Sequence, residues 1–266
     1  EISMGLYRNL CACTVNGVMA DVRTELNEDC EVNLLTFESE EGKHAFWHTA
    51  SHILAQAVKR LYPETKLAIG PAIDNGFYYD FDSEVSFTPE TLEKIEAEMK
   101  KIVKEDIELE KFLVEPDEAI KLMEEKGEIY KVELIKEHAG KNEPISFYKQ
   151  GEFSDVCAGP HILSTGKVKA FKLTACTGAY WRGDSNRKML QRIYGIGFPT
   201  KDELDAYLEA QAEALKRDHN KLGRELEFFT TVEEIGQGLP ILLPKGARVI
   251  QTLQRWVEDE EQKRGY

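Results

Sequence analysis

The chain has 266 residues, 42% of them hydrophobic and 31% charged, which is the composition of an ordinary globular protein with room for two or three small cores. Its formal net charge of -14 excludes a general nucleic-acid coat, although an average charge can hide a local basic patch. The sequence shows no apolar run of membrane-spanning length, no secretory signal and no disulfide pattern among its five cysteines, so we expect a cytoplasmic protein with no membrane partner.

Residues 1–38 are predicted to form a small β-rich piece. Asn16-Gly17 separates two β-prone segments and favours a two-residue hairpin, because both central positions of such a turn need positive φ. A further strand is expected over residues 30–37. These strands are too few for an independent core, so we expect the chain to begin partway through a small domain.

Residues 40–61 form an amphipathic run that predicts a single helix, with Ser39 as its N-cap and Pro63 as its stop. His48 and His52 lie four positions apart and should therefore share one face. By itself, such a pair is as often packed and hydrogen-bonded as it is functional. The metalloprotease motif H-E-x-x-H is excluded, because Thr49 stands in the place of its glutamate.

A second pair, Cys157 and His161, occurs far downstream in the segment Cys-Ala-Gly-Pro-His. Two such pairs can converge on one pocket, either as metal ligands or as hydrogen-bonding groups around a reacting carbonyl. The spacing of the residues leaves both interpretations open.

Between the two pairs, turn residues and apolar periodicity predict alternating strands and helices packed against one antiparallel sheet, which is an α+β domain. A hairpin is expected around Asp74-Asn-Gly76, and a charged helix after the cap Thr88-Pro89. A short helix should start at Pro116, and residues 129–135 have a mixed pattern. The remaining strands are predicted at residues 107–114, 145–148, 153–156, 170–174 and 190–194.

Residues 166–192 reverse the acidic balance of the chain, with only Asp184 opposing their cations. Aromatic residues are interleaved with these cations, a mixture suited to phosphates and unstacked bases, although a solvated surface loop would look the same. The cations from which we expect nucleic-acid contacts are Lys167, Lys169, Lys172, Arg182, Arg187 and Lys188.

Thr200 and Glu203 form a capping box that should open a long charged helix, with leucines marking its apolar side as far as Leu226. We interpret this helix as a connector between domains. Another helix is expected to start near Gly246, and so little chain follows the connector that we expect the C-terminus to interrupt a domain.

Taken together, four segments resemble the N-terminal half of a bacterial-type threonyl-tRNA synthetase: residues 48–52, 68–80, 157–161 and 178–194. The resemblance implies a ubiquitin-like TGS remnant at residues 1–38, an editing domain at 39–199, a linker helix at 200–228 and the start of a class II aminoacylation domain at 229–266. It also implies that the segments binding ATP, magnesium, the catalytic zinc and the anticodon lie beyond Tyr266.

In that family the editing domain hydrolyses serine from mischarged threonine tRNA. The resemblance therefore implies tRNA(Thr) carrying a seryl ester as the partner, and no charging of tRNA by this chain alone. The parent enzyme is expected to be a homodimer, and a monomer is one option for this chain. Two alternatives stay open: a zinc-dependent deacylase of alanyl-type specificity, and a catalytically silent module that binds tRNA.

The resemblance also assigns roles to residues. His48 is expected to position water or the terminal ribose, with His52, Cys157 and His161 completing a polar pocket. Lys131 would orient water or stabilise developing negative charge.

Tyr79 and Asp155 match family positions that line the pocket and bind the seryl group. The family is thought to work without a metal here, so no cofactor is expected for editing. Zinc bound by the four His/Cys residues remains an alternative, because their spacing permits it. A nucleophilic thiolate at Cys157 is a further alternative to direct attack by water.

Overall fold

The computed structural model describes residues 3–138, 143–236 and 238–265. The chain divides into two compact units, Glu1–Leu204 and Asp205–Tyr266. The first unit is an α+β structure with antiparallel sheets, which confirms the predicted fold class. None of the helices in the described part of the chain combines the length and the apolar character that a membrane crossing requires.

The first unit begins with a short helix and a three-stranded sheet in the order β2-β1-β3. Asn16 and Gly17 adopt φ values of 51° and 79°, as the predicted hairpin requires, and they join β1 to β2. The elements are α1 (Met4–Asn9), β1 (Leu10–Val15), β2 (Val18–Ala20) and β3 (Val32–Thr36).

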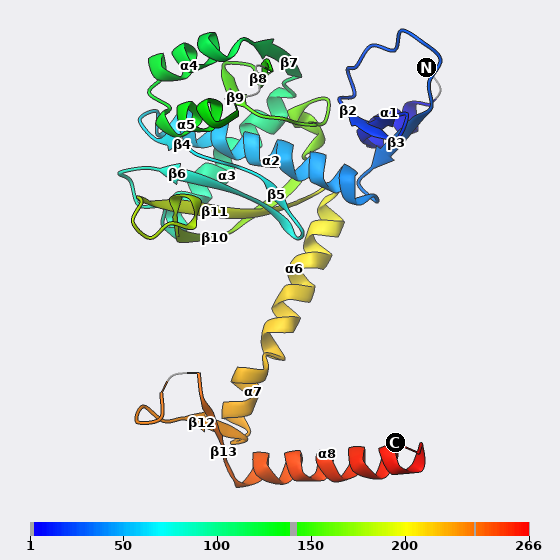
Figure 1. Cartoon of the computed structure of the whole chain (residues 1–266), viewed down its shortest axis with the longest axis vertical. Coiled ribbons are helices and arrows are strands. Elements are labelled where there is room, and N and C mark those ends of the chain that lie inside the picture. The colour runs from blue at the N-terminus through cyan, green and yellow to red at the C-terminus, as the bar shows by residue number, and fades with distance from the viewer. Residues whose placement is uncertain (1–2, 139–142, 237, 266) are drawn as a thin grey trace. The chain divides into compact units, whose positions relative to one another are not determined.

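Helix α2 (Glu40–Leu61) follows directly and has the predicted bounds. The Ser39 side chain accepts a hydrogen bond from the Gly42 backbone and so caps the first turn. The middle of the helix is buried on several sides, with Phe46, Ile53 and Leu54 in the core, and Figure 1 shows it between layers of the first unit.

One layer is a five-stranded antiparallel sheet with the path β10-β11-β6-β4, to which β5 adds beside β6. Strand β6 turns Phe77, Tyr79 and Phe81 toward the same face, and all three side chains are fully buried. The strands are β4 (Lys66–Leu67), β5 (Ala72–Ile73), β6 (Gly76–Asp82), β10 (Ala170–Tyr180) and β11 (Met189–Phe198).

The other layer is a separate sheet, β7-β8-β9, so the expectation of a single sheet is wrong. The reason is the position of α2, which contacts both layers. The Trp47 indole donates a hydrogen bond to the Gly197 carbonyl of β11, and the Gln56 amide donates to the Gln150 carbonyl of β8. The strands are β7 (Leu109–Val114), β8 (Ile145–Gln150) and β9 (Phe153–Val156).

Three further helices complete the first unit, and the cap at Thr88 and the start at Pro116 agree with the sequence prediction. The segment with a mixed pattern is helical. The helices are α3 (Pro89–Glu105), α4 (Pro116–Glu125) and α5 (Ile129–His138), with short 3-10 turns η2 (Thr165–Lys167) and η3 (Trp181–Gly183).

The predicted capping box is present at the start of α6 (Lys201–Lys216): the Thr200 backbone donates to the Glu203 carboxylate at 2.9 Å. The predicted continuous connector helix is wrong, however, because a new helix, α7 (His219–Glu225), starts after Asp218. The Asp218 side chain accepts from the Lys221 backbone and caps this second helix. The rest of the second unit comprises β12 (Phe229–Thr231), β13 (Pro240–Leu242) and α8 (Pro244–Lys263).

Candidate active site

Helix α2 places its two histidines side by side in the interior of the first unit. The ring centroids of His48 and His52 lie 5.2 Å apart, as expected for residues one turn apart. The Ser51 hydroxyl contacts the Gly70 carbonyl at 2.6 Å and so ties the helix to the loop before β5. Gly70 cannot carry a side chain, because a Cβ there would lie 2.0 Å from the Tyr79 ring.

The second pair approaches from the loop that follows β9. Cys157 Sγ lies 3.2 Å from His48 Nε2 and 3.1 Å from His161 Nε2, and the Gly159 backbone donates to the same sulfur at 3.2 Å. The ligating atoms of His48, His52, Cys157 and His161 all lie within 4.8 Å of one another. The structure therefore gathers the two pairs, which are far apart in the sequence, into one cluster.

Thr49 fixes the orientation of His161, and the sequence reasoning assigned it no role. Its hydroxyl lies 2.9 Å from the Ala45 carbonyl, 3.0 Å from His161 Nδ1 and 3.1 Å from the Ile162 backbone nitrogen. All three contacts are hydrogen bonds only if the hydroxyl donates to Ala45 and His161 carries its proton on Nδ1. The sequence feature that indicates this role is the position of Thr49 directly after His48 on a helix that is largely buried.

This tautomer determines which groups donate and which accept hydrogen bonds in the rest of the cluster. Because His161 Nε2 then has no proton, the Cys157 thiol donates to it, and His48 Nε2–H donates to the sulfur in turn. His48 Nδ1 is left with a free lone pair. That nitrogen is buried and has no hydrogen-bond partner among the described residues, which indicates a place for a water molecule or a substrate group.

Burial keeps every member of the cluster uncharged at neutral pH. Desolvation lowers the pKa of His48 and of His161 well below the usual value, and lowers that of His52 to about 4. It raises the pKa of the Cys157 thiol to about 12. A neutral thiol is a poor nucleophile, whereas neutral imidazoles can accept a proton, so the arrangement favours base catalysis over attack by sulfur.

A buried ion pair lies near the histidines. Lys131 Nζ is 2.7 Å from Asp155 Oδ1, and both side chains are only 3% exposed. The Tyr79 hydroxyl donates to Asp155 Oδ2 at 2.5 Å. Burial alone would raise the pKa of Asp155, but the Lys131 charge and these hydrogen bonds hold it below its usual value. The charges of Lys131 and Asp155 also act on the pKa of His52, in opposite directions.

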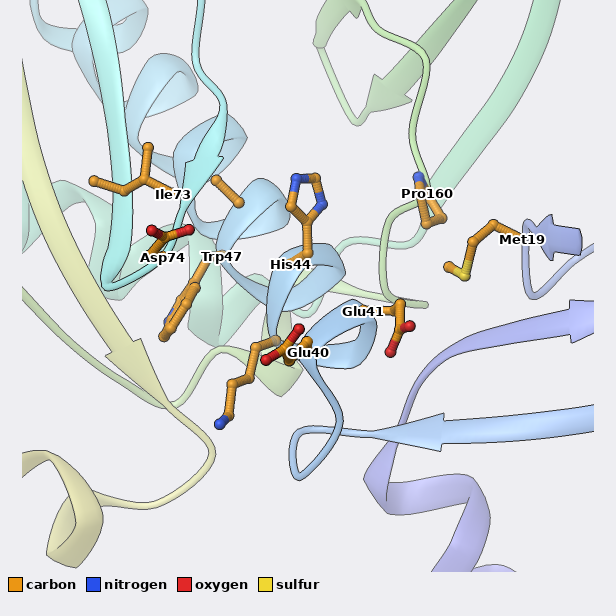
Figure 2. A pocket seen from close by; sticks show the side chains of 10 residues that line it. Met19, Glu40, Glu41, His44, Trp47, Ile73, Asp74 and Pro160 are labelled. Carbon is orange, nitrogen blue, oxygen red and sulfur yellow. The ribbon is translucent and has the colours of Figure 1, made fainter.

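A pocket of about 770 Å³ is lined by residues that neighbour the cluster in sequence, although none of the four clustered residues lines it; Figure 2 shows its lining residues. The His44 ring lines it and lies 6.0 Å from the His48 ring, and Pro160 lines it beside His161. The pocket wall offers an indole and an imidazole together with three carboxylates and one ammonium group, so it suits a sugar or a base better than a phosphate. Its lining residues are Met19, Glu40, Glu41, Lys43, His44, Trp47, Ala72, Ile73, Asp74 and Pro160.

The pair of Lys131 and Asp155 borders a different pocket, of about 350 Å³, which none of the four clustered His/Cys residues lines. The predicted site residues therefore fall into two neighbouring groups rather than around one cavity.

Comparison with known proteins agrees with the motifs. Residues 145–194 match the family described as the threonyl and alanyl tRNA synthetase second additional domain. The whole chain is 62% identical over 266 residues to a threonine–tRNA ligase of Clostridium botulinum, and 61% identical to one of Clostridium perfringens. A threonine–tRNA ligase of Acetivibrio thermocellus is 59% identical over the same span.

The chain is related to threonine–tRNA ligases throughout its length. This relationship confirms the resemblance that the four sequence segments indicate. The chain spans 41% of the length of the first two of these relatives and 42% of the third.

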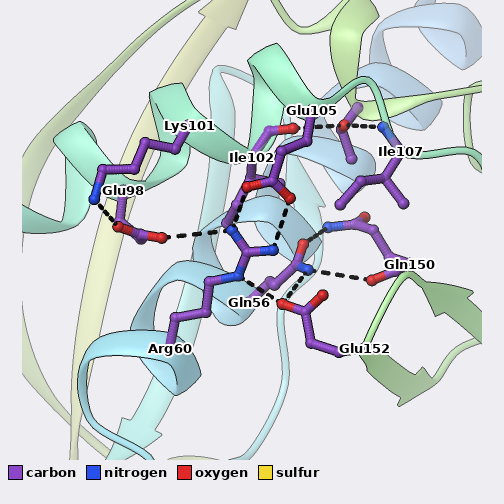
Figure 3. Close-up of polar contacts among 10 residues, drawn as sticks. Gln56, Arg60, Glu98, Lys101, Ile102, Glu105, Ile107, Gln150 and Glu152 are labelled. Carbon is purple, nitrogen blue, oxygen red and sulfur yellow. Dashed lines mark hydrogen bonds and ion pairs between the residues drawn. The ribbon is translucent and has the colours of Figure 1, made fainter.

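A polar network ties α2 to α3 and to the hairpin of β8 and β9 (Figure 3). The Arg60 guanidinium of α2 lies 2.7 Å from Glu105 of α3 and 2.5 Å from Glu152 in the turn between β8 and β9. The buried amides of Gln56 and Gln150 bond to each other at 2.5 Å. The helix that carries His52 is thereby fixed to the hairpin that leads to Cys157.

Most cations of the basic stretch bind carboxylates of the chain itself. Arg182 and Arg187 both pair with Glu133, and Lys188 lies 2.6 Å from Asp82. Lys172 lies 2.9 Å from Glu96, while Lys167 donates to the backbone carbonyls of Tyr7 and Arg8. Among the described residues, Lys169 has no ion-pair partner, and its side chain is exposed. Nucleic-acid contact by this stretch stays a prediction, with Lys169 as its most available cation.

Proposed function

We propose that the chain hydrolyses the ester bond of a mischarged aminoacyl-tRNA, with seryl-tRNA(Thr) as the substrate and water as the nucleophile. The observation that carries the proposal is the free His48 Nδ1 in a neutral, buried cluster, whose His48 ring lies 6.0 Å from the pocket-lining ring of His44. The match to the second additional domain and the names of the relatives supply the substrate class.

The chemical need for such an activity follows from the similarity of the two amino acids. Serine lacks only the methyl group of threonine, and one methyl or methylene group is worth about 1–3 kcal/mol of discrimination in a binding pocket. A synthetase pocket for threonine therefore accepts some serine. A second site that admits serine and rejects threonine can remove the error by hydrolysis.

In the proposed reaction, His48 Nδ1 takes a proton from a water molecule whose oxygen attacks the ester carbonyl. The resulting tetrahedral intermediate collapses by breaking the bond between the carbonyl carbon and the ribose oxygen. The ribose oxygen receives the proton held by His48, and serine and uncharged tRNA leave. Cys157 and His161 keep the His48 ring in the tautomer that leaves Nδ1 free.

Lys131, Asp155 and Tyr79 support this reaction electrostatically in the proposal. Desolvation keeps the imidazoles of His48 and His52 uncharged and so able to accept a proton, while Asp155 raises their pKa and Lys131 lowers it by a smaller amount. In the proposal, Tyr79 and Asp155 bind the seryl group, as the family resemblance implies, once the substrate opens the small pocket that Asp155 lines.

A zinc-dependent deacylase is the second candidate, because three histidines and a cysteine form a donor set that zinc prefers. Zinc would be held by His48, His52, Cys157 and His161, and it would supply Lewis-acid activation of water or of the ester carbonyl if it accepted a fifth ligand. The Cys157 contacts of 3.1–3.2 Å are somewhat shorter than the ~3.3–3.8 Å between ligand atoms expected from usual zinc bond lengths. Zinc would therefore require the Cys157 contacts to lengthen and any separation near the 4.8 Å limit to shorten.

The proposal extends to the larger protein implied by the relatives. We assign residues 1–38 to the TGS remnant, 39–199 to the editing domain, 200–228 to the linker and 229–266 to the start of the aminoacylation domain. The whole protein would ligate threonine to tRNA(Thr) with ATP, as a homodimer in the cytoplasm. The free cysteines agree with a reducing compartment.

The test compares seryl-tRNA(Thr) hydrolysis by the unaltered chain and by His48→Ala, each with and without a zinc chelator. His219→Ala is the matched control, because the His219 side chain is 84% exposed in the second unit. Loss of hydrolysis in His48→Ala alone, without effect of the chelator, supports water activation by His48. Sensitivity to the chelator supports the zinc candidate, and no hydrolysis by the unaltered chain contradicts both.

A further inference from the structure

Two charged residues that follow strand β2 of the N-terminal sheet reach the loop that carries Cys157 and His161. Asp21 follows β2 directly, and its side chain is 6% exposed, while Arg23 lies two residues later. Both belong to the segment that we assign to the TGS remnant, outside the proposed editing domain. A carboxylate so deeply buried needs strong partners.

The partners of Asp21 and Arg23 lie on either side of the loop that carries Cys157 and His161. Asp21 Oδ2 accepts from the Tyr148 hydroxyl at 2.6 Å, and Asp21 Oδ1 accepts from Arg23 Nη1 at 3.0 Å. Arg23 Nη2 donates to the carbonyls of Ile162 and Leu163, each at 2.9 Å. Those two residues directly follow His161.

Tyr148 connects Asp21 to the cluster of histidines and Cys157. Its ring packs edge-on against the His161 ring with centroids 4.4 Å apart. Its hydroxyl lies so close to Gly159 that a Cβ there would be 2.3 Å away, and Gly159 donates its backbone N–H to Cys157 Sγ. The position of the Tyr148 hydroxyl, which Asp21 fixes, thus limits where the loop and the His161 ring can lie.

We infer that Asp21 and Arg23 are positioning residues for the hydrolytic site, supplied by the N-terminal sheet. Arg23 anchors the backbone after His161, and Asp21 holds Tyr148 against Gly159 and the His161 ring. The inference rests on the proposed function for its catalytic consequence. The N-terminal sheet is therefore a structural part of the proposed editing site. A displacement of catalytic groups by about 1 Å can reduce the rate by about a hundredfold, so their positioning has a catalytic consequence.

The first test measures the position of the loop and does not need the hydrolytic activity. Iodoacetamide labels the full chain, and mass spectrometry follows the alkylation rate of Cys157, with Cys30 as an internal reference. Asp21→Asn and Arg23→Gln should each speed alkylation of Cys157 severalfold and leave Cys30 unchanged. The control Glu31→Gln removes an exposed carboxylate of the same segment and should change neither rate. Unchanged Cys157 rates in both variants would overturn the inference.

The second test measures seryl-tRNA(Thr) hydrolysis. Asp21→Asn and Arg23→Gln should lower kcat by about ten- to a hundredfold and leave KM within about twofold, because the groups act through the cluster and not through tRNA. Arg23→Lys keeps the charge and should recover part of kcat. Asp21→Asn should add little to Tyr148→Phe, since both break one contact.

The two tests separate the failures. If the unaltered chain does not hydrolyse seryl-tRNA(Thr), the proposed function fails, and the Cys157 alkylation rates still decide the positioning role. If it does hydrolyse this substrate, while the variants keep both the Cys157 alkylation rate and kcat, the inference about the N-terminal sheet fails alone.

Discussion

Replacing Lys131 by methionine should destabilise the first unit strongly. The substitution keeps the length of the side chain but removes the ammonium group that lies 2.7 Å from Asp155. Asp155 would remain buried, and among the described side chains the Tyr79 hydroxyl would remain as its hydrogen-bond donor. Breaking a buried pair by removing one partner costs about 3–5 kcal/mol, because the other charge stays uncompensated.

A second substitution should recover much of the loss. Asp155→Asn in the Lys131→Met background removes the stranded charge, so the double variant should lie within about 2 kcal/mol of the unaltered chain. Lys149→Met is the matched control. Its pair with Glu110 spans 3.9 Å with side chains 53% and 69% exposed, and exposed pairs contribute about 0–1 kcal/mol.

The assay is urea unfolding at pH 7, followed by tryptophan fluorescence in a Trp256→Phe background, so that Trp47 and Trp181 report on the first unit. Hydrolysis of seryl-tRNA(Thr) is measured in parallel and should be lost in Lys131→Met. Additive free energies for Lys131→Met and Asp155→Asn would refute the reasoning, because they would mean that the two charges do not depend on each other.

Two other predictions concern the site, and a third concerns the basic stretch. Thr49→Val removes the hydrogen-bond partner of His161 Nδ1 and of the Ile162 N–H. It should destabilise the chain by about 1–3 kcal/mol in urea unfolding and slow deacylation by about ten- to a hundredfold. Unchanged rates would contradict the tautomer assignment. Because the pKa of His52 is lowered from 6.5 to about 4, the unfolded state binds more protons in this range, and stability should fall as the pH drops from 6.5 toward 4. In urea unfolding at several pH values, His52→Asn should remove up to about 1.4 kcal/mol per pH unit of this slope, and equal slopes would contradict the lowered pKa. Lys169→Glu should weaken tRNA binding and lower the salt dependence by about one unit of slope, and binding that keeps its affinity and slope would count against contact at this residue.

Elements with local signals could be predicted from the sequence. Asn16-Gly17 requires a particular turn, and Ser39 caps the helix whose apolar pattern runs to Leu61, so both features follow from residues close in the chain. The break in the connector helix is harder to predict from the sequence. Its leucine pattern continues past Asp218, where a new cap interrupts the helix.

The candidate site was only partly predictable, because its contacts join distant segments. The resemblance supplied His48 and Cys157, but not the Thr49 hydroxyl that orients His161. Charge counting also treated Arg187 as available for phosphates, whereas it forms two hydrogen bonds with Glu133, a residue far away in sequence. Such pairings depend on the tertiary fold and produce no periodic pattern in the sequence.

The proposed function requires that this chain removes serine, and not threonine, from tRNA(Thr). The most direct measurement is therefore the ratio of its deacylation rates on seryl-tRNA(Thr) and threonyl-tRNA(Thr) under identical conditions. The seryl ester should be hydrolysed at least about tenfold faster, as expected when a pocket must reject one methyl group. Equal rates on the two esters, or hydrolysis of neither, would contradict it.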